Sequence, residues 1–177
     1  MRATAVNDAP IELEPYNAHW PMLFELEAKS LNALLEPWLA GAIEHIGSTA
    51  VQGLSAKPVI DIMASVRSLE QAEPAIEALS PLGYCYFPYK AEVMHWFCKP
   101  SPALRTHHLH LAVAGSALWL ERIAFRDALR KNALLAAQYQ SLKQRLAGEH
   151  AHDREAYTAG KSPFVQSVLR RAGASAA

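Results

Sequence analysis

A strand, a glycine-serine turn and a second strand that carries one carboxylate follow each other early in the chain, and this run constrains the fold most. It reads His-Ile-Gly-Ser-Thr from residue 45, and Asp61 then lies inside the apolar, β-branched stretch 59–66. Short β-branched stretches of this kind are typical of central strands. A carboxylate in such a strand needs a cation, a metal or several N–H donors, because burying it alone is costly. The run therefore predicts a site at the mouth of a sheet.

The remaining hydrophobic periodicity predicts an α/β fold, with a mixed β-sheet core flanked by helices and a helical C-terminal segment. Strands are expected at residues 11–16, 42–46, 59–66, 84–87, 93–99 and 107–113. Helices are expected at 21–35, 69–82, 116–131, 133–148 and 152–171. The resulting division is a flexible N-terminus (1–10), an α/β core (11–115), a helical segment packed on that core (116–172) and a disordered tail (173–177).

Composition and charge limit the classes of binding partner that we expect. The 177 residues fit one domain, and 17 Lys and Arg residues balance 17 Asp and Glu residues, so no global basic field favours nucleic acid. The two cysteines lack metal-type spacing, and the N-terminus has no apolar signal core. No run of about 18 apolar residues is present to span a membrane. We expect a cytoplasmic protein with reduced thiols and without a membrane or nucleic-acid partner, and we leave its oligomeric state open.

The glycine-serine turn is suited to holding an anion. Gly47 lacks a Cβ, so its backbone can approach a ligand closely and adopt positive φ. Ser48 and Thr49 add hydroxyl groups and N–H donors that can cradle phosphate oxygens. The alternative is structural, with Gly47 in a tight turn and Asp61 paired with Lys57 or an arginine.

Three histidines of one expected strand offer a second set of candidate ligands. Strand alternation places His108 and His110 on one face and His107 on the other. If Asp61 faces the first pair, two imidazoles and one carboxylate would suit Zn²⁺, Mn²⁺ or Fe²⁺. The alternative is a hydrogen-bond network in which one imidazole pairs with Asp61. His45 could join either arrangement.

Together these motifs resemble the GrpB family, and the resemblance runs from residue 12 to residue 171. It rests first on the run from His45 to Asp61, which is distinctive in its length. Shorter matches are His107–His110, Phe125–Asp127, Tyr139, Leu142–Lys143, Tyr157 and Lys161.

The GrpB family is in turn similar to the nucleotidyltransferase superfamily, whose pattern is Gly followed by Gly or Ser, a spacer, and two acidic residues one position apart. Here twelve residues separate Ser48 from Asp61. The resemblance implies that Gly47 and Ser48 hold a nucleotide phosphate, that Asp61 binds a metal, and that Ser48 and Asp61 are catalytic. Met63 occupies the second acidic position, and a thioether is a poor Mg²⁺ ligand. The expected cofactor is therefore a divalent metal, Mn²⁺, Zn²⁺ or Mg²⁺, held by Asp61 with the paired histidines.

Cationic side chains could complete an anion site. Lys57, Arg105, Lys143 and Lys161 are candidates for binding a nucleotide or another phosphorylated small molecule, and Tyr157 could stack a base. Each of these charges is also explained as a solvated surface group or as part of a salt bridge.

Three functions follow from these residues. The first is transfer of a nucleotidyl group to a small acceptor at a site with atypical metal ligands. The second is a non-catalytic nucleotide-binding or accessory module, because relatives of the family occur fused to dephospho-CoA kinase, an enzyme of the coenzyme A pathway. The third is a metal-dependent hydrolase that uses Asp61, His108 and His110.

Overall fold

The structure is a computed structural model that describes residues 10–174. The predicted flexible N-terminus and disordered tail lie outside the described residues, except for Pro10, Gly173 and Ala174. The N–H groups of Gly173 and Ala174 donate to the carbonyls of Arg170 and Leu169. These two residues of the predicted tail therefore cap the last helix.

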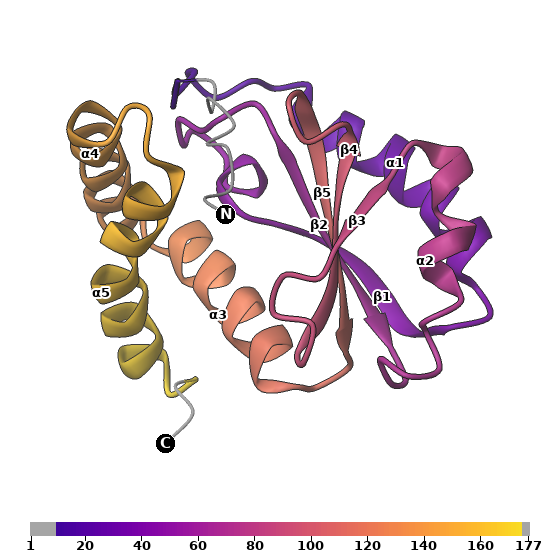
Figure 1. The fold of residues 1–177 in the computed structure, drawn as a ribbon. Helices are drawn as coiled ribbons and strands as arrows, with labels where there is room; N and C mark the ends of the chain where they lie inside the picture. Colours follow the sequence, from indigo (N-terminus) through magenta and orange to yellow (C-terminus); the bar gives the residue numbers. More distant parts are fainter. Residues whose placement is uncertain (1–9, 175–177) are drawn as a thin grey trace, which may run out of the picture.

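Five strands form one mixed sheet in the order β1-β2-β5-β4-β3 (Figure 1). Their bounds are β1 Leu39–Ile46, β2 Ile60–Val66, β3 Cys85–Phe87, β4 Met94–Pro100 and β5 Arg105–Val113. β2 and β5 run parallel, and the other neighbouring pairs are antiparallel. The helices are α1 Trp20–Leu35, α2 Ala75–Ala78, α3 Ala117–Lys131, α4 Ala133–Glu149 and α5 Arg154–Ala172, with 3-10 turns η1 Ser48–Ala50 and η2 Ser80–Leu82. Within residues 10–174, no helix has the length and apolarity needed to cross a membrane.

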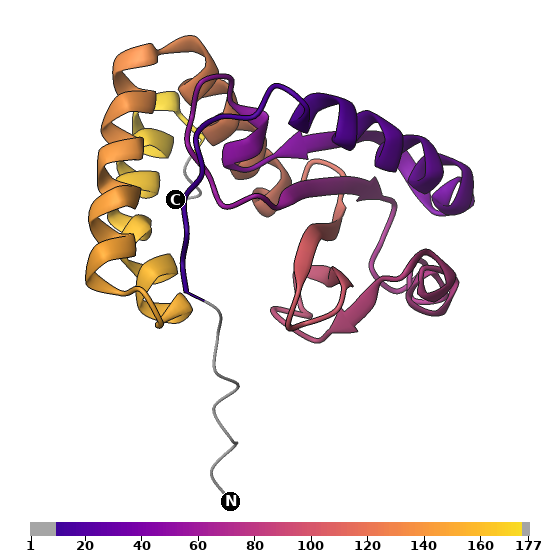
Figure 2. The ribbon, with the colours of Figure 1, turned by 90° about the horizontal axis from the view of Figure 1, so that it is seen from above.

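The two faces of the sheet are covered by different parts of the chain (Figure 1). Ile62 and Leu109 are fully buried on the face that packs against α1 and α2. On the other face, α3 covers Met63 and Ala112. Figure 2 shows α4 and α5 at the opposite end of the molecule from α1, where they pack on each other and on α3. The predicted mixed sheet with flanking helices and a C-terminal helical segment is confirmed.

The first predicted strand, at residues 11–16, is wrong. Apart from one isolated antiparallel bridge at Glu14, this segment pairs with no strand of the sheet. Ile11 instead donates to the carbonyl of Ala151 at 2.8 Å and packs with Leu146 and other side chains of the C-terminal helices. The apolar residue Ile11 of this segment therefore packs against the C-terminal helices and not within the sheet.

The helix predicted at residues 69–82 is also wrong in extent. It is reduced to the four residues of α2 and the turn η2. Pro74 precedes α2, and Pro81 lies at the start of η2. A proline within a helix removes a backbone donor and clashes with the preceding turn, so two prolines break this apolar repeat into short pieces.

Candidate functional site

The parallel pairing of β2 with β5 places an acidic and a basic side chain against each other. Asp61 is the Cα partner of His108, so both side chains leave the sheet on the same face, the one that α3 partly covers. Nδ1 of His108 lies 2.9 Å from Oδ1 of Asp61. Nε2 of His110, two residues further along β5, lies 3.9 Å from the same oxygen.

Asp61 is ionised in this setting. Burial alone would raise the pKa of its carboxyl group, but the hydrogen bond from His108 and the nearby imidazole of His110 outweigh burial and lower that pKa far below its usual range. A carboxylate can only accept, so Nδ1 of His108 carries the proton and donates it to Oδ1. Nε2 of His108 is buried and has no hydrogen-bond partner among the residues that the structure describes. In the neutral imidazole, this nitrogen carries a lone pair that accepts no hydrogen bond from a described residue.

Gly47 brings the backbone directly against this carboxylate. Its φ of 72° and ψ of −174° define a conformation that is open almost only to glycine. A Cβ at this position would lie 2.5 Å from Oδ2 of Asp61, closer than side chains tolerate. The glycine predicted to cradle a phosphate therefore contacts the acid itself, and Ser48 follows it at the start of η1.

Replacing Gly47 by alanine should destabilise the protein by about 3 kcal/mol, because the strained backbone and the disturbed Asp61–His108 bond each cost about 1–2 kcal/mol. Urea unfolding of the purified variant measures the loss. Gly53→Ala is the matched control, since Gly53 also has positive φ (81°) but an added Cβ there meets nothing within 4 Å. Equal losses in the two variants would contradict the importance of the contact with Asp61.

Three lysines from separate parts of the chain gather beside this turn. Lys143 of α4 is 2% exposed, and its Nζ donates to Oγ of Ser48 at 3.0 Å. Lys161 of α5 and Lys57 before β2 both lie over the ring of Tyr157, with Nζ 4.5 Å and 5.1 Å from the ring centroid. Lys57, Lys143 and Lys161 are called the lysine cluster below.

The positively charged ammonium groups of the lysine cluster repel one another. Burial, together with the charges of Lys161 and Lys57, lowers the pKa of Lys143 to about 7. Burial and the charge of Lys57 lower the pKa of Lys161 to about 8, although the Asp61 carboxylate partly compensates. An anion bound among these ammonium groups would relieve their repulsion and stabilise their charged forms. The cluster therefore has the electrostatics of an anion-binding site.

The C-terminal helices hold the lysine cluster in place. Tyr139 of α4 packs with Leu54, which lies in the loop after η1. Gly160 of α5 lies against Leu146 of α4, where an added Cβ would be 2.5 Å from a methyl carbon. The α4 lysine of the cluster also donates to the carbonyl of Ser55. Close packing of α4, α5 and the loop thus fixes the ammonium groups beside the turn.

The structure brings most of the predicted site residues together. They are Gly47, Ser48, Asp61, His108, His110 and the lysine cluster. Thr49 is not among them, because its buried hydroxyl donates to the Val59 carbonyl at 3.3 Å and lies 2.9 Å from Nε2 of His45. His45 is on the α1 face of the sheet, stacked on Phe24, so it joins neither predicted arrangement.

Two other candidates have contacts that differ from the predicted ones. Nε of Arg105 donates to the carbonyl of Pro102 at 3.0 Å, and its guanidinium lies 5.6 Å from the ring centroid of Trp96. These contacts place Arg105 at a tryptophan and not at the lysine cluster. Tyr157 is 2% exposed, so its buried ring is not open to a base.

The predicted metal ligands Asp61, His108 and His110 lie next to one another, and their contacts can be described without an ion. Among residues 10–174, no three His, Cys, Asp or Glu side chains are placed to hold a metal ion. Oδ1 of Asp61 accepts the N–H of His108, while Nδ1 of His110 faces the thioether sulfur of Met94 at 3.4 Å. Met63 is fully buried and supplies no oxygen. Asp61 and His108 thus form the hydrogen-bonded pair expected in the alternative to a Mn²⁺, Zn²⁺ or Mg²⁺ site, with His110 3.9 Å from the carboxylate.

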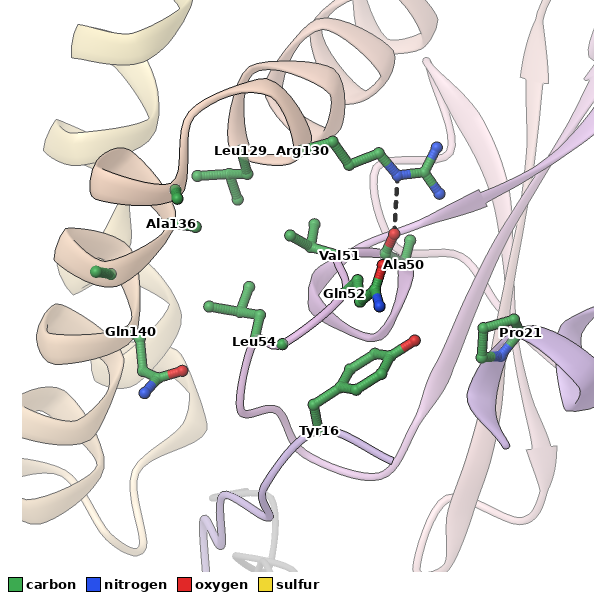
Figure 3. A pocket seen from close by; sticks show the side chains of 13 residues that line it. Tyr16, Pro21, Ala50, Val51, Gln52, Leu54, Leu129, Arg130, Ala136 and Gln140 are labelled. Carbon is green, nitrogen blue, oxygen red and sulfur yellow. Dashed lines mark hydrogen bonds between the residues drawn. The ribbon is translucent and has the colours of Figure 1, made fainter. Parts of the chain in front are cut away.

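A cavity of about 690 Å³ lies against residues 50–54, which comprise the end of η1 and the loop after it (Figure 3). Its lining includes Tyr16, Leu54, Leu129, Arg130 and Gln140. The dashed line in Figure 3 is a hydrogen bond of 2.8 Å from Nε of Arg130 to the Ala50 carbonyl. The lining contains neither the Asp61–His108 pair nor the lysine cluster, so the cavity is separate from the site.

Sequence reasoning missed Trp96, whose ring centroid lies 5.1 Å from that of His108. Strand alternation groups Trp96 with Met94 and Cys98 on one face of β4. That grouping leads to the site only through the pairing of β4 with β5, in which Trp96 lies opposite His110. Neither the strand order nor this register can be read from the sequence.

Comparison with known proteins identifies the relatives of this chain. Residues 10–171 match the family described as GrpB protein. The glutamate-rich protein GrpB of Alkalihalophilus pseudofirmus is 34% identical, over 93% of this chain and 97% of that protein. A dephospho-CoA kinase of Mycolicibacterium paratuberculosis is 27% identical, over 93% of this chain and 46% of that protein.

The fold has a counterpart among solved structures. The crystal structure of the conserved protein GrpB from Enterococcus faecalis superimposes with a TM-score of 0.83 at 31% sequence identity. The match covers 91% of this chain and 96% of that one. Sequence and structure therefore agree that this chain belongs to the GrpB family.

Proposed function

We propose that this protein binds a nucleotide through its phosphates at the lysine cluster and transfers a nucleotidyl group to a small acceptor. The observation that carries the proposal is the contact of Lys143 with Ser48, within reach of the charges of Lys57 and Lys161 and next to an Asp61–His108 pair whose Nε2 has no partner among residues 10–174. An anion and a proton-donating hydroxyl group are the two ligands that such an arrangement can satisfy.

The lysine cluster would act on the phosphates. Its ammonium groups can donate charge-assisted hydrogen bonds to the phosphate oxygens, and the N–H groups of the Gly47-Ser48 turn can add to them. Bound phosphate charge would also hold Lys143 and Lys161 protonated at neutral pH, against the burial that lowers their pKa values. The same charges would stabilise the leaving pyrophosphate.

The Asp61–His108 pair would act on the acceptor. The hydroxyl proton of the acceptor moves to Nε2 of His108, while the hydroxyl oxygen of the acceptor bonds to the α-phosphorus of a nucleoside triphosphate. The bond from that phosphorus to the bridging oxygen breaks, and pyrophosphate leaves with the electron pair. Asp61 keeps the proton of the imidazole on Nδ1 and stabilises the imidazolium that forms. Because Nε2 is buried in the unliganded chain, the acceptor must displace a neighbouring side chain to reach it.

The second candidate is a binding module without turnover. Two observations favour it: a dephospho-CoA kinase contains a segment similar to this chain, and Met63 stands where nucleotidyltransferases carry an acid. In either role the proposed compartment is the cytoplasm, where the free thiols of Cys85 and Cys98 would stay reduced.

Calorimetric titration with tripolyphosphate and with ribonucleoside triphosphates tests binding, and pyrophosphate release in the presence of small alcohols and amines tests transfer. Binding with release supports the enzyme, and binding without release supports the module. Absence of binding by every one of these anions at neutral pH would overturn both candidates.

Affinity for a simple anion should fall as the pH rises through 7 and 8, because Lys143 and Lys161 lose their protons in this range. Above these pKa values, the loss approaches tenfold per pH unit for each proton that binding requires. Sulfate is the probe of choice, since its own charge is constant between pH 6 and 9. The charges that face these lysines are Lys57, Asp61 and Arg122. A dissociation constant that stays flat from pH 6 to 9 would contradict the prediction.

A further inference from the structure

Four side chains form a platform on the far side of His108 from the lysine cluster. The ring of Trp96 is tilted by 51° against the imidazole of His108, and Arg105 lies over the same indole. Phe87 and Tyr89 meet the indole edge-on, with centroids 5.8 Å and 6.3 Å from it. Phe87, Tyr89, Trp96 and Arg105 are called the tryptophan platform below.

The tryptophan platform is accessible. Tyr89 is 52% exposed, and Trp96 and Arg105 are half-buried. An indole that carries a guanidinium on its face and stands partly in solvent is a surface on which a flat aromatic ring can stack. Stacking on such residues depends on the π-face of the ligand and tolerates different bases.

The platform lies in line with the proposed phosphate site. The contacts run without a gap from Ser48 and Gly47 to Asp61, from Asp61 to His108, and from His108 to Trp96. Trp96 is on β4 and Asp61 on β2, with β5 between them. Two strand spacings amount to about 10 Å. The ribose and the phosphate chain of an extended nucleotide can span this length.

We infer that the tryptophan platform receives the planar ring of a ligand whose phosphates lie at the lysine cluster. This inference rests on the proposed function and adds the site that receives the base of the nucleotide. The ribose of such a ligand lies beside Asp61, where its hydroxyl groups find an ionised acceptor, and Nε2 of His108 remains for the hydroxyl group of the small acceptor. Arg105, predicted as a phosphate ligand, becomes a residue that covers the base.

The test compares ligands that differ only in the nucleoside. Each ribonucleoside triphosphate is titrated calorimetrically against inorganic tripolyphosphate, which carries the same phosphate chain without base or sugar. We expect at least one nucleoside triphosphate to bind about 10- to 100-fold more tightly, the size of one base stacked on an aromatic side chain. If all five ligands bind alike, the inference is overturned and the phosphate site stands. If none of the five ligands binds, the proposed function falls with the inference.

Variants of Trp96 supply a second test of the inference. Trp96→Leu should lose the tenfold or larger preference for the nucleotide and keep its affinity for tripolyphosphate, which also shows that the variant is folded. Trp96→Phe retains a π-face and should restore most of the preference. Equal weakening of nucleotide and tripolyphosphate by Trp96→Leu would overturn the inference. The comparison of ligands on the unaltered chain decides the question if that variant does not fold.

Discussion

Lys143→Met is expected to remove anion binding and to make the protein more stable. The ammonium group is buried and held close to two other cations, and burial and these charges lower its pKa to about 7. Methionine has a similar length and no charge to bury. Replacing a buried charged group by an apolar one of similar volume often stabilises by about 1–4 kcal/mol, and the lost hydrogen bonds to Ser48 and Ser55 offset part of this gain. We expect a net rise of about 1–2 kcal/mol at pH 6 and a loss of affinity for tripolyphosphate of about 100-fold or more.

The stability effect of this substitution has a defined dependence on pH. The pKa of Lys143 is about 7 in the folded chain and 10.5 as the ordinary value of a lysine. The unfolded chain therefore binds a proton that the folded chain releases between pH 7 and 10.5, and the cost of the buried charge is complete below pH 7. It shrinks as the pH rises toward 10.5. The advantage of the methionine variant in urea unfolding should be larger at pH 6 than at pH 9.

Lys29→Met is the matched control, because Lys29 is an exposed lysine of α1. It should change neither the affinity for tripolyphosphate nor the pH dependence of unfolding. If Lys143→Met bound tripolyphosphate as tightly as the unaltered chain, the lysine cluster would not be the anion site. If it were less stable at every pH, the buried ammonium group would be structural and not a strained functional group.

The burial of the Lys143 ammonium group next to other cations cannot be predicted from the sequence. Its place in α4 follows from helical periodicity, and the predicted bounds of the last three helices lie within a few residues of α3, α4 and α5. Its burial depends on the docking of α4 against the loop after η1, which is a tertiary contact. Sequence reasoning could therefore list Lys143 as a candidate cation but could not separate it from a solvated surface lysine such as Lys131.

The arrangement of Asp61 and the histidines was easier to predict, because strand periodicity decides which side chains share a face. Alternation correctly grouped His108 with His110 and separated them from His107, which lies 4.0 Å from Glu27 on the opposite face. The sequence does not state that β2 and β5 are neighbours or run parallel. Had the register shifted by one residue, Asp61 would have faced His107 or Leu109. The hydrogen bond between Asp61 and His108 is a consequence of this register.

Asp61→Asn should reduce pyrophosphate release by about 10³- to 10⁴-fold while it changes tripolyphosphate binding only a few-fold. An ionised carboxylate keeps the proton of His108 on Nδ1 and leaves the lone pair on Nε2. An asparagine side chain can donate as well as accept, so it permits the other tautomer and no longer stabilises the imidazolium. The anion is held by the lysine cluster, which loses only the distant attraction of the carboxylate for Lys161. Turnover and binding should therefore separate.

Asp127→Asn is the matched control, because Asp127 is also a paired carboxylate, bound to Nε of Arg126 at 2.9 Å, but it makes no contact with His108 or the lysine cluster among the described contacts. It should leave pyrophosphate release unchanged within a few-fold. Unimpaired release by Asp61→Asn would contradict the assignment of His108 as proton acceptor, because nothing else in the site fixes its tautomer. A variant that loses binding and release together would instead assign Asp61 to the anion site. The ratio of the two losses thus distinguishes a positioning carboxylate from a binding one.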